Sequence, residues 1–105
     1  MTMDIELLVV SDCPNEAAAA ALIATAVADT GVRATITRTT IVSEDQAQQR
    51  GFIGSPTILL DGVDPFAVPA AAVGLACRLY STPNGLAGVP GLRDLRQALK
   101  RVAAG

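Results

Sequence analysis

The chain has 105 residues, half of them apolar, and its formal net charge at pH 7 is −2. This length suits one domain with a modest core, and the apolar content excludes a disordered chain. Four of the eight cationic residues lie in one C-terminal stretch. Nucleic-acid binding requires a broad basic surface, which this distribution of charge does not predict. We therefore expect a single domain over residues 1–105 with no nucleic-acid partner.

The sequence also indicates a protein without a membrane partner. Residues 1–4 lack the basic region of a signal peptide, and the chain then moves directly into an apolar strand pattern. One long apolar run, residues 17–24, is too short to cross a bilayer, and the other, residues 66–77, is interrupted by Pro69 and Gly74. Two cysteines do not form a secreted disulfide framework, so a cytoplasmic protein with reduced thiols is expected.

The first third of the chain predicts a strand followed by a helix. Residues 5–10 are apolar on both faces, as in a strand that is covered on both sides. From Pro14 to about Asp29 the residues favour a helix, and Gly31 is placed to end it. One apolar stripe on this helix is expected to face the sheet: Ala19, Leu22, Ile23, Ala26 and Val27.

The middle of the chain predicts two more strands with a short helix between them. Residues 34–39 alternate β-branched and polar positions, which indicates a strand near a sheet edge. Residues 43–46 form a capping-box pattern for a helix that ends near Gly51. Residues 57–60 predict a buried strand, and the turn Asp61-Gly62 predicts a hairpin that returns through residues 63–66.

The last third has an apolar stretch, residues 67–90, followed by a helix. Residues 77–80 are expected to include a brief extended piece, and residues 83–85 are expected to form a turn. The closing helix has a stripe of Leu92, Leu95, Leu99 and Val102. The expected order is therefore β-α-β-α-β-β-α, with a parallel first pair and an antiparallel hairpin.

Two features within this order carry a resemblance. Cys13 lies at the first strand-to-helix junction, and Pro56, in Gly54-Ser55-Pro56-Thr57, precedes the third strand. This arrangement resembles the thioredoxin-like superfamily in its small, glutaredoxin-like form, over residues 4–66 and 91–103. It implies an α/β fold with a four-stranded mixed sheet, a cis peptide bond at Pro56, and residues 67–90 as an insertion near the site. Three stretches, residues 54–57 (Gly-Ser-Pro-Thr), 61–66 (Asp-Gly-x-Asp-Pro-Phe) and 74–80 (Gly-Leu-x-Cys-Arg-x-Tyr), also look like a bacterial group of small thioredoxin-like proteins that are often labelled thioredoxin family or alkylmercury lyase.

The resemblance also implies roles for individual residues. The family motif Cys-Pro-x-Cys carries a nucleophile first and a resolving cysteine last; here Cys13 fills the first place and Glu16 the last. Cys13 is the expected nucleophile, and Ser55 and Pro56 would shape a substrate groove. Glu16 is either an acid or base beside the thiol or an ordinary residue of a first helical turn. Asp12 is similarly a substrate contact or a turn residue.

Cys77 has two interpretations. A cysteine in an apolar stretch is most often a core thiol. Alternatively, residues 67–90 start at the rim of the site, and Cys77 approaches Cys13 as a resolving thiol. Two cysteines and no histidine do not complete a zinc site of the usual nitrogen and sulfur ligands in a monomer, so neither a metal nor another cofactor is expected.

Three functions follow from these residues. The first is a thiol-dependent redox protein in which Cys13 attacks a disulfide or a peroxide-derived species, and Cys77 or an external low-molecular-weight thiol resolves the product. Its expected partner is a thiol or disulfide substrate, either a protein or a low-molecular-weight compound. The second is a redox-inactive binding module whose residues 67–90 form a partner or homodimer surface. The third is organomercurial or soft-metal chemistry by the two thiolates, with Asp12 or Glu16 as the acid.

Overall fold

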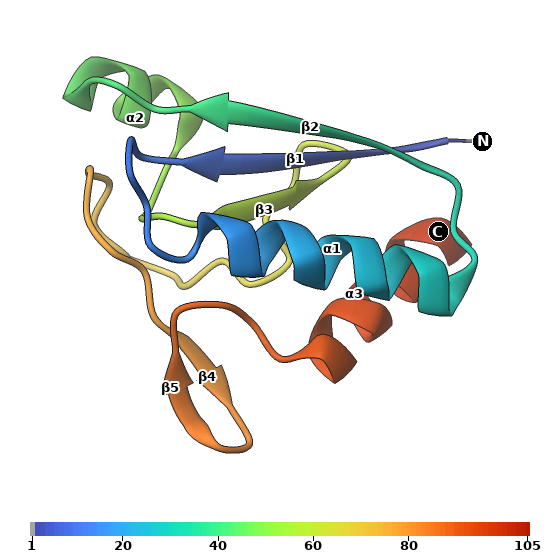
Figure 1. The fold of residues 1–105 in the computed structure, drawn as a ribbon. Helices are drawn as coiled ribbons and strands as arrows, with labels where there is room; N and C mark the ends of the chain where they lie inside the picture. The colour runs from blue at the N-terminus through green and yellow to red at the C-terminus, as the bar shows by residue number, and fades with distance from the viewer. Residues whose placement is uncertain (1) are drawn as a thin grey trace.

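The computed structural model describes residues 2–105, and its centre is a mixed three-stranded sheet (Figure 1). The strands are β1 (Met3–Val9), β2 (Ala34–Thr40) and β3 (Thr57–Leu60), in the order β2-β1-β3. β1 pairs in parallel with β2, as the sequence predicted for a β-α-β start, and antiparallel with β3. β1 lies at the centre with five of its seven residues buried, and the polar β2 lies at an edge.

Two helices cover one face of this sheet. α1 (Glu16–Thr30) and α3 (Leu92–Ala104) contact each other and lie on the same side of the strands in Figure 1. The alanines of α1 leave room for a close approach, and Ala19, Ile23 and Ala26 are buried as the predicted stripe requires. The main core joins these two helices to alternate residues of the sheet: Met3, Ile5, Leu7, Val9, Ile58 and Leu60.

The other face is covered only at one end. α2 (Glu44–Arg50) packs there through Ala47 against a small core with Leu8, Ile41 and Phe52. The predicted capping residue is confirmed, because the Ser43 hydroxyl accepts a hydrogen bond from the Gln46 amide at 3.1 Å. Where this face is open, Glu6 pairs with Arg50, and this ion pair lowers the pKa of Glu6.

The predicted four-stranded sheet is wrong, because residues 63–66 form no strand. Asp61 and Gly62 do make the turn, with φ of 50° and 84°, but Val63 makes a single bridge to Leu60. The Asp64 carboxylate then accepts a hydrogen bond from the Phe66 amide at 2.9 Å, which turns the chain away from the sheet. The intervening Pro65 has no N–H to give to a ladder, so the hairpin ends there.

A separate two-stranded hairpin replaces the missing strand pair. β4 (Tyr80–Thr82) and β5 (Gly85–Ala87) pair antiparallel around the predicted turn at residues 83–85. Figure 1 shows this hairpin projecting away from the main sheet, connected to α3 by a short loop. The elements thus follow the order β-α-β-α-β-β-β-α. No helix within residues 2–105 has both the length and the apolar character that a bilayer crossing needs.

Candidate thiol site

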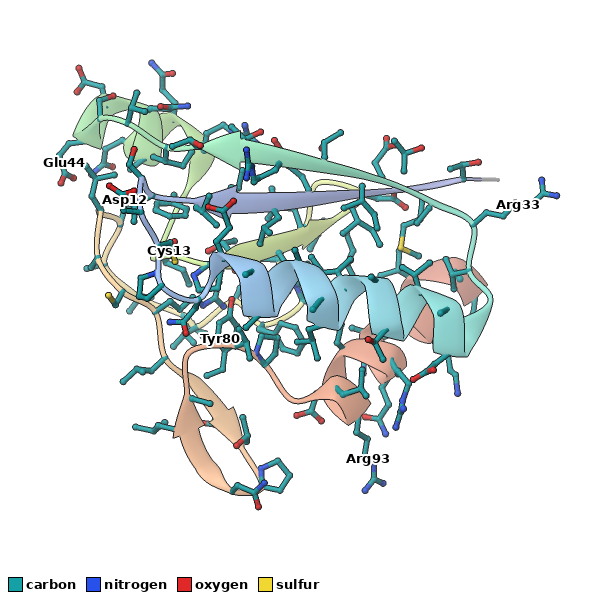
Figure 2. All side chains as sticks on the ribbon, in the orientation of Figure 1. Asp12, Cys13, Arg33, Glu44, Tyr80 and Arg93 are labelled. Carbon is teal, nitrogen blue, oxygen red and sulfur yellow. The ribbon has the colours of Figure 1, made fainter. Side chains whose placement is uncertain are left out.

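Cys13 lies where β1 passes into α1, as the sequence predicted. It is half-buried and packs against the main core, and its carbonyl accepts a hydrogen bond from the Glu16 amide at 3.2 Å. The preceding residue, Asp12, is exposed and has a φ of 58°, so it acts as the turn residue that redirects the chain. Figure 2 shows Asp12 and Cys13 together at one end of the sheet, with Arg33 at the opposite end.

Glu16 is held by an arginine that sequence reasoning did not connect with the motif. It is the first residue of α1, and its carboxylate accepts a hydrogen bond from Arg38 Nη1 of β2. The side chain of Arg38 is 63% exposed and that of Glu16 is 26% exposed. Cys13, Glu16 and Arg38 line one groove, so a cation faces the same space as the thiol.

This groove, which we call the α1–β2 groove, has a volume of about 510 Å³. It runs between the first turns of α1 and the edge strand β2. Its remaining wall is largely apolar or small. The residues that line it are Leu7, Cys13, Glu16, Ala17, Ala20, Ile36, Thr37 and Arg38.

Ser55 and Pro56 lie on the other side of the chain that leads to Cys13, in a fully buried loop. The peptide bond between them is cis, as expected from the resemblance. The Ser55 hydroxyl accepts a hydrogen bond from the Val10 amide at 3.1 Å, which ties this loop to the end of β1. The Pro56 carbonyl accepts one from the Tyr80 hydroxyl. This loop is therefore fixed from two directions.

The backbone of Ser55 is paired with the chain's own later segment. Its amide donates to the Ala76 carbonyl at 2.8 Å, and its carbonyl accepts from the Arg78 amide at 3.0 Å. These two bonds make a parallel bridge between Ser55 and Cys77. We call residues 76–80 the anchored segment. The segment places Cys77 beside Ser55, with its side chain exposed.

Gly54 permits this close pairing. Its φ is 137°, and a Cβ atom on it would lie 2.8 Å from the Arg78 Cβ and 3.3 Å from the Ala76 carbonyl oxygen. A residue other than glycine would therefore both strain the loop and push the anchored segment away.

Arg78 fixes the anchored segment from within. Its side chain is 5% exposed, and its guanidinium donates to the Asp64 carboxylate at 2.7 Å, to the Thr57 hydroxyl at 3.1 Å and to the Phe66 carbonyl at 2.7 Å. It also lies 4.5 Å from the centre of the Tyr80 ring. Burial raises the pKa of Tyr80 well above its ordinary value. The nearby Asp64 carboxylate acts in the same direction, and Arg78 opposes both.

The structure thus groups the predicted site residues in two sets. Cys13 and Glu16 share the α1–β2 groove, whereas Ser55, Pro56 and Cys77 belong to the paired loop and the anchored segment. Ser55 links the sets through Val10, three residues before Cys13. Both cysteines are free thiols. Sequence reasoning missed Arg38 and Arg78, and the only available signal was that each is a cation in an otherwise uncharged stretch.

We also looked for a metal-binding cluster and for similar proteins. Within residues 2–105 the structure has no group of three or more His, Cys, Asp or Glu side chains that would hold a metal ion. Comparisons with protein-family models, with curated proteins and with solved structures found no match to the chain.

Proposed function

We propose that the protein is a thiol-dependent redox protein of thioredoxin-like type, with Cys13 as its nucleophile. The observation that carries this proposal is the position of Cys13: a half-buried thiol at a strand-to-helix junction that lines an open groove together with a cation. Reactive cysteines occupy such partly exposed positions near helix starts and positive charge, where the thiolate is stabilised.

The reaction is a thiol–disulfide exchange. The Cys13 thiolate attacks one sulfur of a disulfide, the Cys13–S–S bond forms, and the other sulfur leaves as a thiolate that takes a proton from water. A second thiolate then attacks the mixed disulfide. An external thiol that attacks the substrate sulfur releases Cys13 as a thiolate. An internal thiol instead attacks the Cys13 sulfur, releases the substrate half as a thiolate and leaves an internal disulfide, which an external thiol then reduces. Cys77, exposed beside Ser55, is the internal candidate for this second step, and a low-molecular-weight thiol is the external one.

Mass spectrometry after treatment with a small disulfide tests this function. We expect a mixed disulfide at Cys13 in the wild type, or a Cys13–Cys77 disulfide where the internal thiol resolves it. Cys13→Ser should abolish both products, whereas Cys77→Ser should leave only the mixed disulfide. A wild-type protein whose Cys13 stays unmodified, while an unfolded control of the same chain reacts, would contradict the proposal.

A redox-inactive binding module is the second candidate, and one observation favours it. The stretch 67–90 exposes four large apolar side chains: Val68, Leu75, Leu79 and Leu86. Exposed apolar residues gathered in one stretch suit a partner or homodimer surface. Sedimentation of the wild type and of Leu79→Ser at several concentrations tests this role. A monomer in both cases would argue against the homodimer.

A further inference from the structure

The two sides of Cys13 differ in what they offer to a substrate. An extended polypeptide is bound most simply by adding a strand to free backbone groups at a sheet edge. Next to Pro56 those groups belong to Ser55, and both are already bonded to the anchored segment. The buried side chain of Arg78 is hydrogen-bonded to Asp64 and Thr57, and these bonds hold that segment in place. The edge at Ser55 is therefore closed to a second chain.

The α1–β2 groove is open, and it contains Cys13 itself. Its volume of about 510 Å³ lies within the roughly 300–1,000 Å³ that small-molecule sites occupy. Leu7, Ala17 and Ile36 give it an apolar wall, and the alanines keep it wide because their side chains are short. A molecule bound here would place a short apolar arm on this wall with its sulfur at Cys13.

Arg38 adds a charge preference at the mouth of the groove. A guanidinium has five N–H donors, and the bond to Glu16 uses Nη1, so donors are left for a second carboxylate. With 63% of its side chain exposed, Arg38 reaches a ligand without leaving Glu16. A ligand carboxylate there would gain a charge-assisted hydrogen bond.

Resting on the proposed function, we infer that the substrate is a low-molecular-weight disulfide with a short apolar arm that ends in a carboxylate, and that it binds in the α1–β2 groove. Cys13 attacks its nearer sulfur, the arm stays in the groove as a mixed disulfide, and the other half leaves as a thiolate that is protonated by water. The disulfide is the oxidant, and the thiol that later releases the arm is the reductant, so electrons balance over the two exchanges.

The test compares two aryl disulfides in a Cys77→Ser background, where Cys13 is the reacting thiol. Dithiobis(nitrobenzoate) carries a carboxylate on each ring, and dithiodipyridine has rings without one. The measured quantity is the rate constant for dithiobis(nitrobenzoate) divided by the rate constant for dithiodipyridine. A change in the general reactivity of Cys13 alters both rate constants alike and therefore largely cancels from this ratio. Arg38→Met should lower this ratio about fivefold, the effect of one nearby charge at a partly exposed site.

Two matched variants separate the effect of the Arg38 charge in the groove from the effect of the protein's overall surface charge. Arg38→Lys keeps the cation and should restore most of the ratio, and Arg33→Met removes a cation from the far end of the sheet (Figure 2) and should leave it unchanged. An equal ratio in all of these variants, with Cys13 still reactive, would overturn the inference and leave the thiol function standing.

Filling the groove gives an independent measurement. Ala20→Leu projects into it, whereas Ala21→Leu, the next residue of α1, is exposed and lies outside the lining. Ala20→Leu should slow both aryl disulfides severalfold relative to methyl methanethiosulfonate, whose arm is a single methyl group. Equal effects of the two substitutions would overturn the inference. A Cys13 that reacts with none of the three reagents would overturn the proposed function as well.

Discussion

Two arginine–carboxylate pairs lie on the two sides of the site, and they differ in their exposure to water. Arg78 and Asp64 are 5% and 14% exposed, and Arg78 is also bonded to Thr57 and Phe66. Arg38 and Glu16 are 63% and 26% exposed and join only the rims of the α1–β2 groove. The same pair of residue types therefore fixes a loop where it is buried and forms a solvent-exposed contact where it is not.

The largest expected effect comes from breaking the buried pair. Arg78→Met leaves the Asp64 carboxylate without its partner, which should lower the free energy of unfolding by about 3–5 kcal/mol. Arg38→Met, the matched change on the exposed side, should lower it by about 0–1 kcal/mol. Urea denaturation of both variants measures the difference. Similar losses in the two would show that exposure does not separate these pairs.

Gly54→Ala tests the closeness of the anchored segment. The new Cβ would lie 2.8 Å from the Arg78 Cβ at a φ of 137°, so we expect a loss of about 2–3 kcal/mol. Gly51→Ala is the control, because its φ is also positive, at 59°, but a Cβ there meets nothing within 4 Å. That variant should lose only about 1 kcal/mol. Thermal or urea unfolding of both proteins separates contact from backbone strain.

Tyr80→Phe removes one hydrogen bond from the anchored side. The Pro56 carbonyl loses its donor, which should cost about 1–2 kcal/mol near neutral pH. The pKa of Tyr80 is raised by burial, so the unfolded chain releases this proton at lower pH than the folded one. Wild-type stability should therefore fall as pH rises above the ordinary tyrosine value of 10.0, and the phenylalanine variant should lack this contribution.

The measurement is urea unfolding of both proteins on either side of that pH. The difference in the free energy of unfolding between wild type and Tyr80→Phe should shrink above that pH. Only the wild type has a phenol that stays protonated in the folded chain and ionises in the unfolded one. A difference that stays constant across this range would mean that Tyr80 titrates alike in the folded and unfolded chains.

The smallest effect concerns the thiol on the open side. Glu16→Gln removes a negative charge beside Cys13, and the alkylation of Cys13 by iodoacetamide should become about two- to fivefold faster. Arg38→Met should slow it by a similar factor, and the double variant should return near the wild-type rate. Asp29→Asn, in the last turn of the same helix, is the control. A Glu16→Gln rate equal to that of this control would show that the groove charges do not reach the sulfur.

The sequence predicted the elements whose patterns are local. The β1 run, the alanine stripe of α1, the Ser43 cap and the αL glycines at residues 31 and 51 all rest on contacts between near neighbours, and the structure confirms them. The turn at Asp61-Gly62 was also local, and it formed. Its return strand failed because Asp64 and Pro65 redirected the chain, so turn chemistry prevailed over β propensity.

The candidate site was predicted only in part, for a related reason. Cys13 and Pro56 were found from short motifs. Two contacts of the site join residues more than twenty positions apart in the chain. Ser55 pairs with residues 76 and 78, and Glu16 pairs with Arg38. A single sequence gives no pattern for such contacts. The burial of Arg78 could not be predicted, because arginine side chains are rarely buried unless they are paired. Its three hydrogen-bond acceptors come from residues that are distant in the chain.

The projecting β4–β5 hairpin has a practical consequence. Its tip, Pro83 and Asn84, is exposed, and a loop tip of this kind tolerates added residues. The hairpin connects directly to the anchored segment, since β4 begins at Tyr80. A fluorophore or epitope grafted at Asn84 would therefore leave Cys13 unchanged, and it would report any motion of the adjoining anchored segment.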